Sequence, residues 1–198
     1  MGKQFTIILS IIILFSSCED ERSRLGDKYF NEGKYQKAVQ IYTEFLRMMP
    51  SHLKTIYNRG RAYEELEQYE KALEDFHRTL KIDPKNVSAM LSIGNYYYRI
   101  EDFDQGLFYF EKALVEDGSN AQAFFLKARS NHRMGNIQDA MTDYNNAINI
   151  NPDHGEAYLY RGAIRVHIKS FKGACKDFKL AQALGLLDAE EAIEKYCR

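Results

Sequence analysis

This chain of 198 residues repeats its own pattern every 34 residues, and that period constrains its fold more than any other feature. One column of the repeat holds small residues, at Gly26, Gly60, Gly94, Ala128 and Gly162. A second column holds bulky aromatic residues, at Tyr42, Phe76, Phe110, Tyr144 and Phe178. A fixed period of this length is typical of stacked helical hairpins, because each hairpin buries its apolar face against its neighbours.

Each repeat contains two segments in which apolar residues return at helical spacing, separated by a short polar turn. In the second repeat, Ile56, Gly60 and Tyr63 mark the first segment, and Ala72 and Phe76 mark the second. The small residues allow the two backbones to approach closely, while the aromatic rings fill the space around them. We therefore expect an all-α chain of helix-turn-helix repeats.

These columns resemble the tetratricopeptide repeat family, whose pattern runs L-G-x-x-Y, then A-x-x-x-F, then Pro near the end of the repeat. The first repeat reads Leu25-Gly26-x-x-Tyr29, then Ala38-x-x-x-Tyr42, then Pro50. The resemblance implies a right-handed solenoid of five repeats with a C-terminal capping helix. The expected repeats cover residues 19–52, 53–86, 87–120, 121–154 and 155–188, and the capping helix covers 189–198.

The N-terminal segment follows a different pattern. Residues 5–15 are almost entirely apolar, with Lys3 before them and Ser16, Ser17 and Cys18 after them. The run is shorter than the roughly 20 apolar residues of a membrane-spanning helix. A basic start, a short apolar core and small residues at the exit indicate a secretory signal peptide over residues 1–17.

The cysteine at the end of this signal resembles the lipobox of bacterial lipoproteins, although Phe15 stands where that family usually has Leu. The resemblance implies cleavage before Cys18 and attachment of diacylglycerol and an acyl chain such as palmitate to that residue. The protein would then be anchored to a membrane of the bacterial cell envelope, on the periplasmic face or at the cell surface. Two alternatives are an uncleaved signal anchor and N-myristoylation at Gly2.

The two remaining cysteines, Cys175 and Cys197, form an even pair in an exported protein. A disulfide between them would join the capping helix to the last repeat and stabilise the fold by about 3 kcal/mol. The alternative is that both are buried thiols that act as small apolar side chains.

The charge pattern and the motifs exclude several classes of function. The chain has 27 basic and 28 acidic residues, and this balance gives no broad attraction for nucleic acid. It lacks a nucleophile elbow and a phosphate-binding glycine loop, and its five histidines are scattered over different repeats. We therefore expect no catalytic residues, no metal and no cofactor, and the protein is not expected to be an enzyme.

In tetratricopeptide repeat proteins the inner face is lined chiefly by the first helix of each repeat. The register places these candidate partner-binding residues there: Tyr57, Asn58, Arg61, Asn95, Tyr98, Arg99, Phe125, Arg129, His132 and Arg133. Tyr and Arg are the side chains that most often anchor protein interfaces. The set differs from the carboxylate clamp of chaperone-binding members of the family, of which only Asn58 is present.

These observations predict a membrane-anchored lipoprotein that acts as a scaffold or adaptor and binds a partner protein or peptide in a concave groove. An acidic or extended peptide would suit the mixture of arginines and aromatic rings. The alternatives are a structural subunit of a cell-envelope assembly that packs through its convex face or solenoid ends, and a groove without a dedicated ligand.

Overall fold

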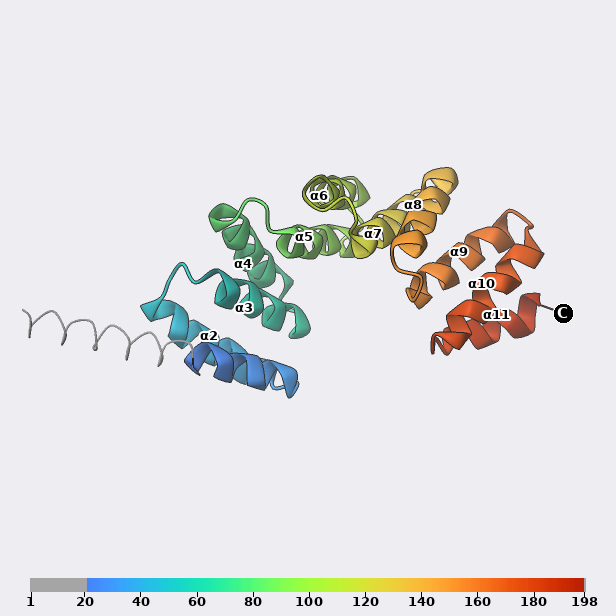
Figure 1. Ribbon diagram of the computed structural model, residues 1–198. Helices are drawn as coiled ribbons and strands as arrows, with labels where there is room; N and C mark the ends of the chain where they lie inside the picture. Colours follow the sequence, from blue (N-terminus) through green and yellow to red (C-terminus); the bar gives the residue numbers. More distant parts are fainter. Residues whose placement is uncertain (1–20, 198) are drawn as a thin grey trace, which may run out of the picture. The chain divides into compact units, whose positions relative to one another are not determined.

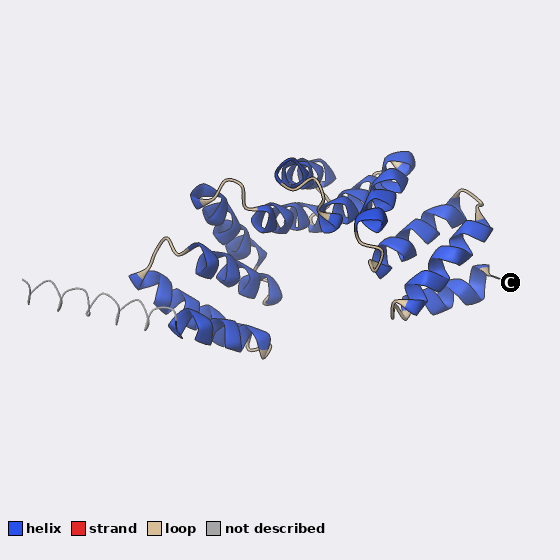
Figure 2. Cartoon of the chain, viewed as in Figure 1, coloured by secondary structure: helices blue, strands red, loops and turns tan. Residues whose placement is uncertain are grey.

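The computed structural model describes residues 21–197, and every regular element in that range is a helix (Figures 1 and 2). Residues 21–31 are helical. The helices that follow are α2 (Tyr35–Met48), α3 (Leu53–Glu65), α4 (Tyr69–Ile82), α5 (Val87–Arg99), α6 (Phe103–Glu116), α7 (Ala121–Arg133), α8 (Ile137–Ile150), α9 (Gly155–His167), α10 (Phe171–Ala183) and α11 (Asp188–Tyr196). Consecutive helices form antiparallel pairs, which confirms the predicted all-α, TPR-like solenoid fold. The predicted signal peptide and Cys18 lie outside the described residues.

The chain divides into two compact units, Met1–Ala89 and Met90–Arg198. In the N-terminal unit α3 packs against both α2 and α4. In the C-terminal unit each helix from α6 to α11 packs against the next one along the chain. Within residues 21–197, every helix is too short or too polar to cross a bilayer.

The two helices of a repeat meet where a small residue faces an aromatic ring. A Cβ atom added to Gly60 would lie 2.8 Å from the ring of Phe76, and one added to Gly162 would lie 2.5 Å from the ring of Phe178. Both rings are almost completely buried. A side chain at these glycines would therefore force the rings and the helices apart.

The turn inside each repeat has the same backbone geometry. One residue in every turn has a positive φ, and these residues are Gly33, Glu67, Glu101, Gly135 and Lys169. The amide of the residue that follows donates to the carbonyl five residues back, as from Lys34 to Tyr29 at 2.9 Å and from Gln68 to Tyr63 at 2.9 Å. This is the Schellman arrangement that ends a helix on a left-handed residue. The sequence pattern predicted the turns but not their common conformation.

In three of the repeats, an ion pair joins the first helix to the second. Arg59 contacts Asp75 at 2.7 Å, and Arg161 contacts Asp177 at the same distance. Asp75 and Asp177 are buried, and each accepts two hydrogen bonds from its arginine. The fourth repeat has a longer version, in which Lys127 lies 3.7 Å from Asp143. The third repeat instead has Ile93 and Tyr109 at these positions.

The C-terminal end of the fold is closed by α11, which packs on α10 and buries Ala189 completely. The Cα atoms of Cys175 and Cys197 lie 5.4 Å apart, and the structure joins the two residues by a disulfide. This spacing is within the range that a disulfide requires. The oxidation state of the pair in solution stays a prediction.

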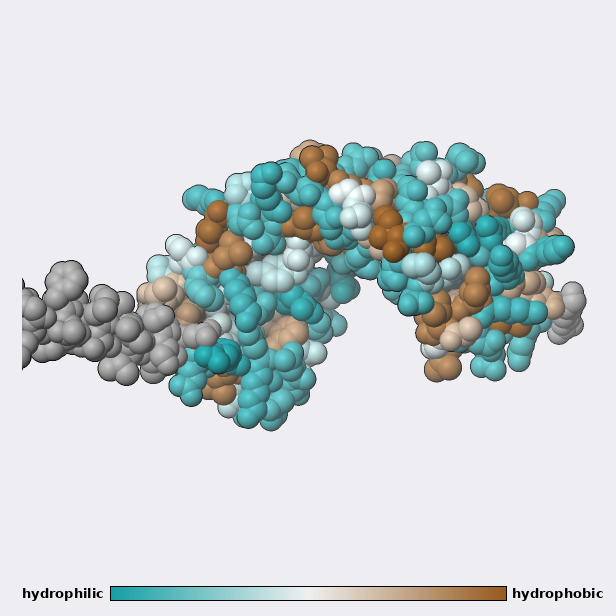
Figure 3. All heavy atoms as spheres, viewed as in Figure 1, coloured by the Kyte–Doolittle hydropathy of each residue, from teal (hydrophilic) through white to brown (hydrophobic). Residues whose placement is uncertain are grey.

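On the face shown in Figure 3, hydrophilic residues predominate and hydrophobic areas are scattered among them. The most exposed large apolar side chains in the described range include Val115 and Leu187, each 82% exposed. Single exposed apolar residues are common on protein surfaces, and exposure alone does not mark a binding site.

Candidate partner-binding site

The predicted partner-binding residues lie on the first helices of three repeats. Helix α3 carries Tyr57, Asn58 and Arg61; α5 carries Asn95, Tyr98 and Arg99; α7 carries Phe125, Arg129, His132 and Arg133. Residues spaced three or four apart share one face of a helix, so each set has a common direction. The structure brings some of them together around two clusters, one in each unit.

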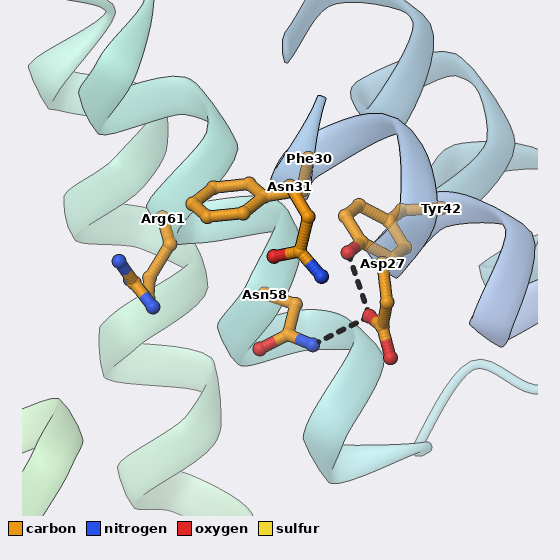
Figure 4. Close-up of a pocket in the computed structure, with 6 residues that line it drawn as sticks. All are labelled: Asp27, Phe30, Asn31, Tyr42, Asn58 and Arg61. Atoms are coloured by element: carbon orange, nitrogen blue, oxygen red, sulfur yellow. Dashed lines mark hydrogen bonds between the residues drawn. The ribbon is translucent and has the colours of Figure 1, made fainter. Parts of the chain in front are cut away.

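The cluster in the N-terminal unit is a pocket of about 210 Å³ (Figure 4). It is lined by Asp27, Phe30, Asn31, Tyr42, Asn58 and Arg61. One carboxylate oxygen of Asp27 accepts hydrogen bonds from the Tyr42 hydroxyl at 2.7 Å and from the Asn58 amide at 2.8 Å. Its other oxygen accepts from Lys54 Nζ at 2.8 Å. The pocket thus contains a carboxylate of the chain itself, Asp27, which accepts hydrogen bonds from three donors.

These contacts favour the ionised form of Asp27. Burial is the largest influence and raises the pKa of this carboxyl, but the hydrogen bonds from Lys54, Tyr42 and Asn58 and the charge of Lys54 together lower it below its ordinary value. Arg61 lies at the edge of the pocket with its guanidinium 4.9 Å from the centre of the Phe30 ring. Arg61 is exposed and carries the positive charge among the residues that line the pocket, so it can contact an acidic partner.

The cluster in the C-terminal unit is centred on Arg129. Its guanidinium lies 4.6 Å from the ring centre of Tyr98, 5.4 Å from that of Tyr160 and 5.7 Å from that of Phe125. Arginine stacks on aromatic faces in this way through its planar, weakly hydrated cation. The rings come from α5, α7 and α9, so three repeats contribute to the cluster.

Two buried polar atoms in this cluster have no hydrogen-bond partner in the described part of the chain. They are Nε of Arg129 and the hydroxyl oxygen of Tyr144. Tyr144 is completely buried, and its ring stacks on that of Tyr160 with centres 6.2 Å apart. Burial raises the pKa of Tyr144 far above its ordinary value, so the hydroxyl keeps its proton and remains a donor.

The structure corrects the expectation for Phe125. This residue is only 1% exposed, and it packs against Tyr144 and His154 with ring centres 6.0 and 4.5 Å apart. It lies three residues before Ala128, on the helix face that packs inside the repeat, so its apolar ring is not presented to solvent. Phe125 instead packs against Arg129, whose guanidinium lies 5.7 Å from the centre of its ring.

The last turn of α7 carries the other two candidates. Arg133 contacts Glu101 at 2.6 Å and lies 5.4 Å from the ring centre of Phe103. Both members of this ion pair are exposed, so the pair adds little to stability. The pKa of His132 is lowered by burial and by the nearby His167, which favours the neutral imidazole near pH 7.

The remaining candidates, Tyr57, Asn95 and Arg99, do not belong to either cluster. Tyr57 packs its ring 5.6 Å from that of Phe76, Asn95 is partly exposed, and Arg99 is exposed at the end of α5. Residues 21–197 contain no group of three or more His, Cys, Asp or Glu residues placed to hold a metal ion.

The predicted partner-binding residues do not include Asp27 or Tyr144, which the structure places in the two clusters. A signal for both was present in the register, because Asp27 and Arg129 occupy the same column, as do Tyr42 and Tyr144. The residue in the first of these columns is acidic in the first repeat and basic in the fourth. The tyrosine hydroxyl therefore faces an acceptor in the first repeat and a cation in the fourth.

Comparison with protein families and curated proteins identifies the repeats. Residues 54–86 and residues 91–150 each match a family model described as tetratricopeptide repeat. A 48-residue stretch is 44% identical to human mitochondrial import receptor subunit TOM70 and covers 22% of this chain. The match spans 8% of the length of TOM70.

Several solved structures share the fold. Pseudomonas aeruginosa pilF has a TM-score of 0.79 at 14% identity, over 86% of this chain and 78% of that one. PilW, described as a type IV pilus biogenesis factor, has a TM-score of 0.76 at 20% identity, over 84% of this chain and 77% of that one. MamA from Desulfovibrio magneticus RS-1 has a TM-score of 0.73 at 18% identity, over 84% and 94%. At these identities the likeness is one of fold.

Proposed function

We propose that this chain, which is a tetratricopeptide repeat protein, is an interaction scaffold or adaptor that binds a partner protein or peptide on the first helices of its repeats. The observation that carries this proposal is the placement of arginines over aromatic rings on those helices, with Arg61 over Phe30 and Arg129 over Tyr98 and Tyr160. Such pairs combine a large contact area with a cation, which favours extended acidic peptides.

We further propose that the scaffold is tethered to a membrane of a bacterial cell envelope through lipid on Cys18. The support is the sequence of residues 1–18, in which a short apolar run ends on small residues and a cysteine. The fold is shared with PilW, whose description names a type IV pilus biogenesis factor, and a role in an envelope assembly is compatible with that likeness. In this proposal the lipid concentrates the scaffold at the membrane and the repeats recruit the partner. The proposal involves no metal, cofactor or nucleic acid.

Binding is tested by selecting random displayed peptides on the full-length protein held in detergent. We expect enrichment of peptides rich in Asp and Glu, and we expect Arg61→Glu combined with Arg129→Glu to abolish that enrichment. The matched control is Lys112→Glu, which reverses an exposed charge on the second helix of a repeat. Failure to enrich any peptide class on the wild-type protein contradicts the scaffold function.

The anchor is tested by intact mass spectrometry of the chain produced in a bacterial host. We expect a mass equal to residues 18–198 with attached lipid, and we expect Cys18→Ser to retain residues 1–17. A wild-type protein that retains residues 1–17 without lipid would contradict the proposed anchor.

A second candidate function is a structural subunit that packs through the second helices. It is favoured by two exposed apolar side chains that lie seven residues apart and therefore on one face of α6, Phe108 at 51% and Val115 at 82% exposed. Chemical crosslinks from a partner to α6 that persist in the Arg61→Glu, Arg129→Glu protein would favour this alternative.

A further inference from the structure

The C-terminal unit contains a polar cluster whose hydrogen bonding is incomplete, and the N-terminal unit contains its complete counterpart. In the first repeat, Tyr42 donates to Asp27 at 2.7 Å. A shift of three repeats places Tyr144 at the position of Tyr42 and Arg129 at the position of Asp27. The acceptor of the tyrosine proton is therefore replaced by a cation, which cannot accept a hydrogen bond.

The consequence is two buried donors without an acceptor. Nε of Arg129 and the hydroxyl of Tyr144 both lack a partner within the described residues. An unpaired buried donor loses the hydrogen bonds that it made to water, so native structures rarely leave one without a function. Two such donors in one cluster call for a shared acceptor.

The surroundings of these donors fit an anion. The guanidinium of Arg129 lies 4.6 Å from the ring centre of Tyr98 and 5.4 Å from that of Tyr160, and a guanidinium stacked on aromatic rings is well suited to recognise a carboxylate. Arg129 is partly exposed and can be approached from the surface, whereas its Nε and the hydroxyl of Tyr144 are buried beneath it. Its neighbour Arg133 is already paired with Glu101, whereas the contacts of Arg129 are with aromatic rings.

We propose that Arg129 and Tyr144 form a carboxylate-binding site, walled by Tyr98 and Tyr160, that receives an Asp or Glu side chain of the partner. The incoming carboxylate restores the arrangement of the first repeat, with the acid supplied by the ligand instead of by the chain. It accepts from the guanidinium edge of Arg129 and from the hydroxyl of Tyr144, and the guanidinium turns from the rings to admit it. This inference rests on the proposed scaffold function and specifies which chemical group the scaffold recognises.

The experiment uses full-length protein in detergent and follows the Nε–H resonance of Arg129 by NMR. The probe is the blocked peptide acetyl-Ala-Ala-Asp-Ala-amide, and its isosteric control carries Asn instead of Asp. We expect the Asp peptide to shift the Arg129 resonance in a saturable manner, and we expect the Asn peptide to bind at least tenfold more weakly. Equal binding of the two peptides overturns the proposal.

Two further probes identify the source of the anion. A peptide whose only carboxylate is its C-terminus tests recognition of a chain end, and inorganic phosphate tests a general anion site. We expect the Asp side chain to bind more tightly than either probe. Tighter binding of the chain end or of phosphate overturns the assignment to an acidic side chain.

Two variants test the roles of the named residues. Tyr144→Phe removes only the hydroxyl, and the fold tolerates the change because Phe76, Phe110 and Phe178 occupy the same column. We expect Tyr144→Phe to weaken binding of the Asp peptide about fivefold to tenfold and Arg129→Gln to remove it, while Lys112→Gln, an exposed change on the second helix of a repeat, leaves binding unchanged. Unchanged affinity in Tyr144→Phe or Arg129→Gln overturns the proposal.

The outcomes also separate this site from the scaffold function. If displayed peptides are still enriched on the Arg129→Gln protein with the same acidic sequences, the carboxylate site is wrong and the scaffold function stands. If the wild-type protein enriches no peptides, the scaffold function itself fails.

Discussion

At the residue scale, the stability of the N-terminal unit depends on the ionisation of Asp27. Its carboxylate holds Tyr42, Asn58 and Lys54 in place, and its pKa is lower in the folded chain than its ordinary value of 3.8. A lowered pKa contributes stability above the unfolded pKa and loses it as the pH falls through the folded pKa. Acid is therefore expected to weaken the N-terminal unit through this residue.

Asp27→Asn is expected to lower the free energy of unfolding by about 1–2 kcal/mol at pH 7, because hydrogen bonds to an ionised group are lost. The difference from wild type should begin to shrink near the unfolded pKa of about 4 and should disappear as the pH falls through the lower pKa that Asp27 has in the folded chain. Urea denaturation followed by circular dichroism at several pH values measures both effects. Glu65→Gln, an exposed change on α3, is the control. A difference that stays constant with pH would contradict this role of Asp27.

The same scale shows what the sequence could and could not predict. The 34-residue register placed Arg129 on the correct helix and revealed that Tyr144 shares a column with Tyr42. It could not show that Phe125 points inward, since neighbouring helical residues differ by about 100° in direction and the exact face depends on packing. It also gave no measure of the unpaired state of Tyr144, because hydrogen bonding depends on the positions of side chains from other helices.

At the element scale, some of the turns that end the first helices contain backbone strain that the sequence pattern does not reveal. Glu67 has a φ of 57°, in the left-handed region that glycine adopts without strain. A residue with a Cβ pays about 1 kcal/mol or more there. Gly33 and Gly135 avoid that cost at the same position of their repeats. Periodicity predicted where the helices end, whereas the backbone conformation of the ends required the structure.

Glu67→Gly is accordingly expected to stabilise the N-terminal unit by about 0.5–1 kcal/mol, because the turn loses its backbone strain. Glu74→Gly, within the exposed face of α4, is expected to destabilise it by about 1 kcal/mol. Thermal and urea unfolding of the two variants provide the comparison. Destabilisation by both changes would show that the left-handed turn imposes no strain on Glu67.

At the scale of the whole molecule, a repeat protein is stabilised by each repeat and by the contact with its neighbours, so its ends are its weakest parts. The C-terminal end is closed by α11, and the Cys175–Cys197 disulfide joins that helix to α10. A link of this kind removes conformational entropy from the unfolded end.

Reduction of the disulfide, or Cys197→Ser, is expected to lower the stability of the C-terminal end by about 3 kcal/mol. Hydrogen exchange followed by mass spectrometry should show faster exchange in α10 and α11 and unchanged exchange in α3. Exchange in α3, which belongs to the N-terminal unit, is the internal control. Equal exchange in oxidised and reduced protein would indicate that the two cysteines act only as apolar side chains.

The constant geometry of the five turns limits how a chain of this type can change in length. An extra residue in one turn would break the hydrogen bond from the residue after the left-handed position to the carbonyl five residues back. Such a change would disturb the packing of the two helices of that repeat. Viable lengthening or shortening therefore proceeds by duplication or loss of complete 34-residue blocks, and single-residue indels are confined to the loops between them or to the two termini.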